Sequence, residues 1–246
     1  LMQNQVDKAL SFCREQLAAA KTPQHKAFCH FLRGRVHLQA QNVRAAKTDF
    51  EQAIKANPDW VSPYMLLARL EAATGNTEQV INHYQTIHAK RPQYLPAVMT
   101  LGVLMERKGD TDQAMTYYEK CLEIDDSFSP AANNLAYLKI EQGEDLDRAL
   151  ALAQTAKREN PDDPGISDTL GWALVHKKIY SSAIAHFKDA LDQMGGNPTV
   201  HYHMAVAHYR NDNAQAAMSH LNQAVQAKTP FPEKEKARKL MQEIQQ

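Results

Sequence analysis

A period of 34 residues runs through almost the whole chain. Small residues recur at a spacing of 34 residues, or once 35: Gly34, Ala68, Gly102, Ala136, Gly171 and Ala205. The neighbours recur as well, with Leu101 before Gly102 and Leu170 before Gly171. A fixed period of this length predicts stacked copies of one small unit, because no single copy can bury its own apolar face.

Each unit is predicted to form two antiparallel helices joined by a short turn. In the third unit, residues 96–108 run without a helix breaker, Gly109 and Asp110 end the run, and residues 111–124 form a second apolar-periodic segment. At about 100° per residue, one stripe of the first helix collects four side chains: Val98, Leu101, Gly102 and Met105. The small residue in this stripe is expected to let the paired helix approach closely.

This pattern resembles the tetratricopeptide repeat, whose 34-residue helix–turn–helix unit has the consensus W-x2-L-G-x2-Y, then A-x3-F, then P. In the third unit, Leu101 and Gly102 match the first part, and Ala114 and Tyr118 match the second. The resemblance implies an all-α fold. It implies a right-handed solenoid of about six helix–turn–helix repeats with an N-terminal half repeat and a C-terminal capping helix.

The repeats expected from this resemblance make residues 1–246 a single solenoid. Six full units are predicted at 27–60, 61–94, 95–128, 129–163, 164–197 and 198–231. Residues 4–20 match the second helix of a preceding unit, which suggests that the chain was cut from a longer protein. Residues 232–246 are expected to form the capping helix. The single longer spacing places an extra residue in the turn 143–147, where an insertion lengthens a surface loop without moving a helix face.

The charge balance argues against several classes of partner. With 28 basic and 28 acidic side chains and a pI near 7.3, the chain has no basic excess to attract nucleic acid. No apolar run approaches the roughly 18–20 residues that span a bilayer, so direct membrane insertion is not expected. The first residues lack the pattern of a secretory signal. The compartment stays open between cytoplasm and periplasm.

The residues also argue against an enzyme and against a cofactor. The sequence has no Gly-rich phosphate loop, no G-x-S-x-G elbow and no H-E-x-x-H pair. Three of its eleven histidines, His201, His203 and His208, share one predicted helix. Their side chains point about 200° and 140° apart, so they do not converge on a metal. The three cysteines fall on apolar helix faces, as core thiols do.

The family resemblance also implies where a partner binds. The first helices of successive units line the concave wall of such a superhelix, the family's usual peptide-binding groove, and the residues opposite the buried stripe face it. The predicted site residues are Arg69, Arg107, Asn133, Asn134, Tyr137, Asp168, Trp172, His176, Tyr202 and His203.

These side chains suit a protein or peptide ligand. Arginines such as Arg69 and Arg107 bind carboxylates bidentately, and an amide such as Asn134 bonds both groups of a peptide backbone. Trp172 offers rigid anchor area. The alternative is that some of the aromatic residues pack between neighbouring units and that the arginines are simply solvated. The Lys and Asn pattern of the family's two-carboxylate clamp is absent.

A narrower resemblance concerns the later repeats. The stretches from Asn134 to Tyr137 and from Asp168 to Trp172 are similar to repeats of bacterial tetratricopeptide proteins that accompany exopolysaccharide export and surface-protein sorting. We therefore expect a protein-interaction scaffold in a bacterial envelope or exopolysaccharide assembly. Two alternatives stay open. The chain could be a structural repeat that self-associates through its solenoid ends, or the recruiting domain of a larger enzyme.

Overall fold

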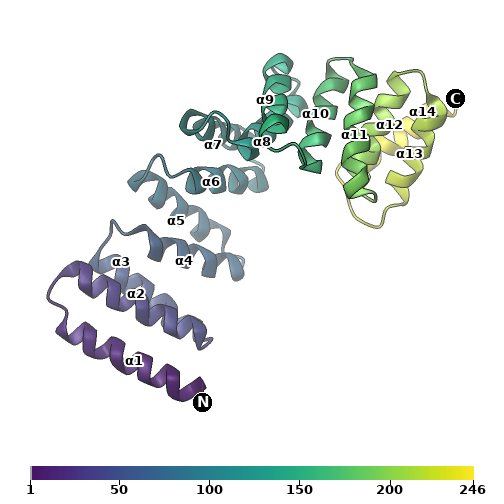
Figure 1. Cartoon of the computed structure of the whole chain (residues 1–246). Helices are drawn as coiled ribbons and strands as arrows, with labels where there is room; N and C mark the ends of the chain where they lie inside the picture. The colour runs from purple at the N-terminus through teal and green to yellow at the C-terminus, as the bar shows by residue number, and fades with distance from the viewer. Residues whose placement is uncertain (1) are drawn as a thin grey trace. The chain divides into compact units, whose positions relative to one another are not determined.

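The computed structural model describes residues 2–246, with side chains described from Asn4 onward. In these residues it contains fourteen α-helices and no strand (Figure 1). Successive helices pair through short turns, and one pair follows another along the chain. The predicted all-α repeat fold is thus confirmed. Among the described helices, none combines the length and the apolar character that a membrane span requires.

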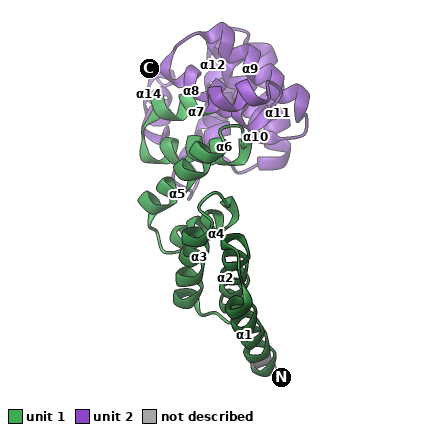
Figure 2. Cartoon of the chain, turned by 90° about the vertical axis from the view of Figure 1, so that its left-hand side faces the viewer, with its two compact units in different colours: residues 1–117 green, residues 118–246 purple. Residues whose placement is uncertain are grey.

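The helices fall into two compact units, residues 1–117 and 118–246 (Figure 2). The first contains α1 (Met2–Ala19), α2 (Pro23–Gln39), α3 (Val43–Ala56), α4 (Val61–Ala73), α5 (Thr77–Lys90) and α6 (Leu95–Lys108). The division falls within α7 (Thr111–Ile124). The second unit continues with α8 (Ser129–Gln142), α9 (Leu146–Glu159), α10 (Pro164–His176), α11 (Tyr180–Met194), α12 (Pro198–Arg210), α13 (Ala214–Gln226) and α14 (Lys234–Ile244).

Small residues on the first helices allow close packing within each pair. The stripe predicted for α6 is buried at all four positions. In α2, a Cβ atom added to Gly34 would lie 2.7 Å from Phe50 Cε1 of α3, so only glycine fits there without a shift of the ring. The pairs α2 with α3, α10 with α11 and α12 with α13 pack along their lengths. The buried face of one helix therefore depends on its partner helix.

The turn inside each repeat uses one left-handed residue at an equivalent position. These residues have φ between 58° and 82°: Gln41, Gly75, Gly109, Gly143, Lys178 and Asp212. In most repeats the next residue caps the second helix. In the fourth repeat Glu144 intervenes between Gly143 and the N-cap Asp145, so the extra residue does lie in this turn. Asp145 itself has a φ of 42°.

Three equivalent positions all carry titratable side chains in the first and last full repeats. They are His30, His37 and Asp49 in one and His201, His208 and His220 in the other. Asp49 is only 2% exposed, and Arg33 donates to both of its carboxylate oxygens, at 3.0 and 2.9 Å from Nε. A buried carboxylate is stable only when paired in this way. The polar group therefore fixes α3 against α2.

The sixth repeat replaces that ion pair with a stack of histidines. His201 and His220 approach to 3.0 Å between their Nδ1 atoms, and the rings of His208 and His220 stack at 7° with centroids 5.6 Å apart. His201 Nε2 lies 3.0 Å from the Gly195 carbonyl, which can only accept. His201 therefore donates from Nε2 and, when neutral, accepts from His220 at Nδ1. Burial lowers the pKa values of His208 and His220, so these two rings are held in the neutral form.

Candidate functional site

The predicted site residues divide between the two units. Eight lie on the first helices of unit 2, and Arg69 and Arg107 lie on α4 and α6 of unit 1. In unit 2, α10 and α12 bring three of them together. The rings of Trp172 and His203 stack at 14° with centroids 4.1 Å apart, and Tyr202 lies 6.3 Å from Trp172. The structure therefore gathers residues about 30 positions apart into one aromatic cluster.

This cluster is largely buried. Trp172 and Tyr202 are each 8% exposed, and His203 is 1% exposed. Burial, followed by the nearby carboxylates of Glu233 and Glu141, raises the pKa of Tyr202 to about 12. Most of the Trp172 ring thus contacts its own chain. This burial favours a structural role for Trp172, in packing between neighbouring repeats of unit 2.

Carboxylates hold the polar edges of the cluster. Trp172 Nε1 donates to Glu141 Oε1 of α8 at 2.9 Å, and His203 Nδ1 donates to Asp168 Oδ1 at 2.9 Å. His203 Nε2 is buried and has no hydrogen-bond partner among the described residues. A buried polar atom of this kind is uncommon and requires a water molecule or another partner. Asp168 thus orients a ring whose other nitrogen is unsatisfied.

The amides of α8 behave differently from one another. Asn134 Nδ2 donates to the Tyr118 hydroxyl at 3.1 Å, and Asn133 Nδ2 donates to Asn134 Oδ1 at 3.3 Å. Asn133 Oδ1 is buried and has no partner in the described part of the chain. Tyr137 is half-buried against the aromatic cluster. Asn134, the amide expected to bond a peptide backbone, is therefore engaged by Tyr118 and Asn133. The unpaired amide oxygen on α8 belongs to Asn133 instead.

The exposed rim of unit 2 is formed by different residues. His176 is exposed and meets the edge of Trp172, with ring centroids 4.8 Å apart. Beside it lies a hollow of about 460 Å³ that Val206 and Arg210 also line. A partner that reaches unit 2 from solvent meets this rim before it meets the buried rings.

The last helix contributes to this surface, which sequence reasoning missed. Lys236 Nζ lies 3.9 Å from Glu141 Oε2, and the Tyr209 hydroxyl donates to Glu243 Oε1 at 2.8 Å. Lys236 follows Tyr202 by 34 residues, and Glu243 follows Tyr209 by the same interval. The 34-residue spacing could have predicted this contribution, because it makes α14 equivalent to the first helix of a further repeat.

Unit 1 offers a more open surface on the same helix type. A hollow of about 480 Å³ is lined by three residues of α2 and four of α4: Phe31, Arg35, Leu38, Ser62, Met65, Leu66 and Arg69. Arg35 and Arg69 are exposed, and no hydrogen bond or ion pair engages either guanidinium among the described residues. Arg107, also exposed, does not line this hollow. The floor is apolar and the rim is cationic.

An aromatic group borders this hollow. Trp60 lies 4.5 Å from Phe31 and 6.2 Å from Phe28, measured between ring centroids, and Phe28 is 49% exposed. Trp60 was not among the predicted site residues, because it precedes α4 and falls outside the periodic stripe. Exposed aromatic side chains of this kind commonly anchor protein interfaces.

Models of the tetratricopeptide repeat match residues 27–60, 107–172 and 174–244. Comparison with curated proteins gives no significant match.

Solved structures with the same fold have low sequence identity. YrrB, described as a TPR protein with an unusual peptide-binding site, is 20% identical with a TM-score of 0.61, over 77% of this chain and 97% of that one. The pilF protein of Pseudomonas aeruginosa is 14% identical with a TM-score of 0.65, over 89% and 99%. PilW, described as a type IV pilus biogenesis factor, is 17% identical with a TM-score of 0.60, over 89% and 98%.

Proposed function

Since the chain belongs to the tetratricopeptide repeat family, we propose that it is a non-enzymatic scaffold that binds a segment of another protein along its first helices. Proteins of this family generally mediate protein–protein interactions. The hollow of unit 1 between α2 and α4 carries the proposal, because all its lining residues come from first helices and it is open to a ligand.

The chemistry of that hollow indicates the kind of segment. Phe31, Leu38 and Met65 provide apolar area that an aliphatic or aromatic side chain would cover. Arg35 and Arg69 lie one repeat apart, at equivalent positions, and both guanidinium groups are available for carboxylates. The segment would therefore combine apolar residues with Asp, Glu or a terminal carboxylate.

In unit 2 we propose a second contact surface on the first helices. It comprises the predicted residues Asn133, Asn134, Tyr137, Asp168, Trp172, His176, Tyr202 and His203. Because Trp172 and Tyr202 are buried, a partner would contact the exposed rim at His176. YrrB, the peptide-binding relative, supports a peptide ligand for this fold.

An envelope assembly is the cellular setting that we propose for the scaffold. The similarity of the stretches from Asn134 to Tyr137 and from Asp168 to Trp172 to bacterial export and sorting repeats supports it. PilW, a pilus biogenesis factor with the same fold, adds support of the same general kind. An exopolysaccharide assembly is the narrower form of this proposal.

A peptide selection tests the binding function directly. The full chain is used to select from a random-peptide library, and the enriched peptides are titrated by fluorescence anisotropy. We expect apolar and acidic sequences, and about tenfold weaker binding for Arg35→Gln or Arg69→Gln. Lys188→Ala, on the exposed face of α11, is the control and should bind like the parent.

Two results would contradict the proposal. If no peptide is enriched and light scattering shows concentration-dependent growth, self-association becomes the better explanation. If Lys188→Ala weakens binding as much as Arg69→Gln does, the ligand binds the second helices instead.

A further inference from the structure

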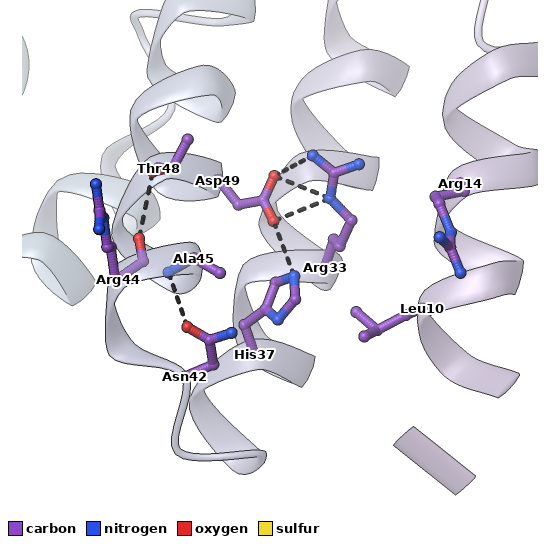
Figure 3. Close-up of a pocket in the computed structure, with 9 residues that line it drawn as sticks. All are labelled: Leu10, Arg14, Arg33, His37, Asn42, Arg44, Ala45, Thr48 and Asp49. Carbon is purple, nitrogen blue, oxygen red and sulfur yellow. Dashed lines mark hydrogen bonds and ion pairs between the residues drawn. The ribbon is translucent and has the colours of Figure 1, made fainter. Parts of the chain in front are cut away.

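A second hollow in unit 1 has a different chemistry. It measures about 590 Å³ and lies between α1, α2 and α3, with α2 as its floor and the other two helices as its walls (Figure 3). Arg14 comes from α1, Arg33 and His37 from α2, and Arg44 from α3. Asp49 is the single carboxylate among its lining residues. Three arginines therefore surround one acidic group.

The carboxylate is already neutralised by one of these arginines. Arg33 donates to Asp49 from Nε and, at 2.5 Å, from Nη2, and His30 Nδ1 lies 3.1 Å from Asp49 Oδ1. His37 Nε2 approaches the other oxygen at 3.8 Å. Asp49, which belongs to α3, is thus buried and fully engaged against α2. The positive charges of Arg14 on α1 and Arg44 on α3 are therefore left without an acidic partner among the lining residues.

Those walls hold unused hydrogen-bond donors. The Arg14 and Arg44 side chains are exposed, and among the described residues neither guanidinium takes part in a hydrogen bond or an ion pair. Asn42 caps α3 by accepting from the Ala45 backbone amide at 3.2 Å, which leaves its side-chain NH₂ group available. The start of α3 adds the partial positive charge of a helix N-terminus. The hollow therefore presents several unused donors, and the one carboxylate among its lining residues is already engaged.

We propose that this hollow binds a phosphate group. Planar guanidinium groups pair bidentately with phosphate oxygens. The guanidinium groups of Arg14 and Arg44, which Figure 3 draws on opposite sides of the Arg33–Asp49 pair, each suit a doubly charged phosphate better than a single carboxylate. A volume of about 590 Å³ holds a phosphate together with part of the molecule that carries it. That carrier is either a small polyphosphate or a phosphorylated side chain.

The site is independent of the groove proposed for peptide binding. Arg33 and His37 project from one side of α2, whereas Phe31, Arg35 and Leu38 lie about 140–200° around the helix from Arg33. The two hollows are therefore on opposite faces of one helix. Failure of peptide binding would leave the phosphate site untouched.

Calorimetric titration of the full chain at constant ionic strength tests the proposal. The probes are inorganic pyrophosphate and a phosphoserine peptide, with the unphosphorylated peptide and a glutamate-substituted peptide as comparisons. We expect saturable binding of at least one phosphorylated probe. Arg14→Gln and Arg44→Gln should each weaken it about tenfold or more. Arg91→Gln, an exposed arginine of the same unit outside the hollow, should bind like the parent.

The arms of the experiment separate the outcomes. Binding of pyrophosphate alone identifies a small-molecule source, and preference for the phosphoserine peptide identifies a modified protein; both support the site. Equal losses in Arg14→Gln and Arg91→Gln would show only unspecific charge attraction and overturn it. So would glutamate binding as tight as phosphoserine binding, or no saturable binding by either probe.

Discussion

Gly171 packs directly against the ring of Phe187: a Cβ atom at position 171 would lie 2.6 Å from Phe187 Cε1. The ring is fully buried and has little room to move. The sixth repeat has Ala205 and Leu221 at the same two positions. The larger side chain thus stands opposite glycine, and the smaller one opposite alanine.

We expect Gly171→Ala to lower the free energy of unfolding of unit 2. Overpacking costs about 1–3 kcal/mol, which exceeds the roughly 1 kcal/mol that alanine gains in a helix. When Phe187 is replaced by Leu, the same change should become stabilising, because the space that Ala205 uses opposite Leu221 is restored. Urea denaturation measures both effects.

The chain supplies its own reporter for this experiment. Trp60 lies in unit 1 and Trp172 in unit 2, and they are the only two tryptophans in the sequence. A Trp60→Phe background therefore makes fluorescence specific for unit 2. An identical effect of Gly171→Ala with Phe187 and with Leu at position 187 would contradict size matching.

Lys178 is the second target, because its φ of 62° suits glycine. A residue with a side chain loses about 1–2 kcal/mol in this region, so Lys178→Gly should stabilise unit 2 by about 0.5–1 kcal/mol after the entropy of glycine is included. Neighbouring Lys177 has a φ of −84°, and Lys177→Gly should be neutral or destabilising. Matching shifts in the urea midpoint for both variants would argue against the turn as the cause.

The stacked histidines predict a loss of stability in acid. Burial, together with His201 and His208, lowers the pKa of His220 from 6.5 to about 4. The unfolded chain therefore binds more protons below pH 6.5. The stabilising contribution is complete above pH 6.5 and is lost as the pH falls from 6.5 toward 4, on the order of 2 kcal/mol. Urea midpoints at pH 7.5 and 5 measure it.

A matched pair of variants assigns this effect. Leu152 occupies the position of His220 in the fourth repeat, so His220→Leu is a natural replacement that should reduce the pH dependence of unit 2. Exposed His25 serves as the control, and His25→Gln should leave it unchanged. An undiminished pH dependence in His220→Leu would assign the acid sensitivity to other groups.

Trp172 is the fourth target, and its burial predicts a structural effect. Trp172→Ala removes the stack with His203 and the bond to Glu141, and a substitution of this kind costs about 3–5 kcal/mol. Circular dichroism should show a lower melting temperature, whereas Lys188→Ala should melt like the parent. Unchanged melting together with weaker peptide binding would instead make Trp172 an exposed anchor.

The fold followed from the sequence because one period controls every repeat. The spacing of Gly102 and its neighbours set the helix pairs, and the breaker at Gly109 set a turn. These are local signals that each copy repeats. The position of the extra residue near Glu144 followed from the same spacing.

The site was less predictable because it depends on distances between repeats. Helical phase placed Trp172 and His203 on first helices, but only the three-dimensional packing shows that their rings stack and are buried. The burial of Asp49 could not be predicted, since a charged residue in a helix usually faces solvent. Its partner Arg33 sits 16 positions earlier, a separation that no short motif reveals.

The ion pair of Arg33 and Asp49 also bears on how the chain avoids folding incorrectly. Similar repeats risk pairing a first helix with a second helix from the wrong copy. One repeat further along, Leu67 and Glu71 occupy the places of Arg33 and His37. If α3 paired with α4 in the way it pairs with α2, Asp49 would be buried against an apolar side chain and another carboxylate. An unpaired buried charge is destabilising by several kcal/mol, so this single pair discriminates against a slip of one repeat.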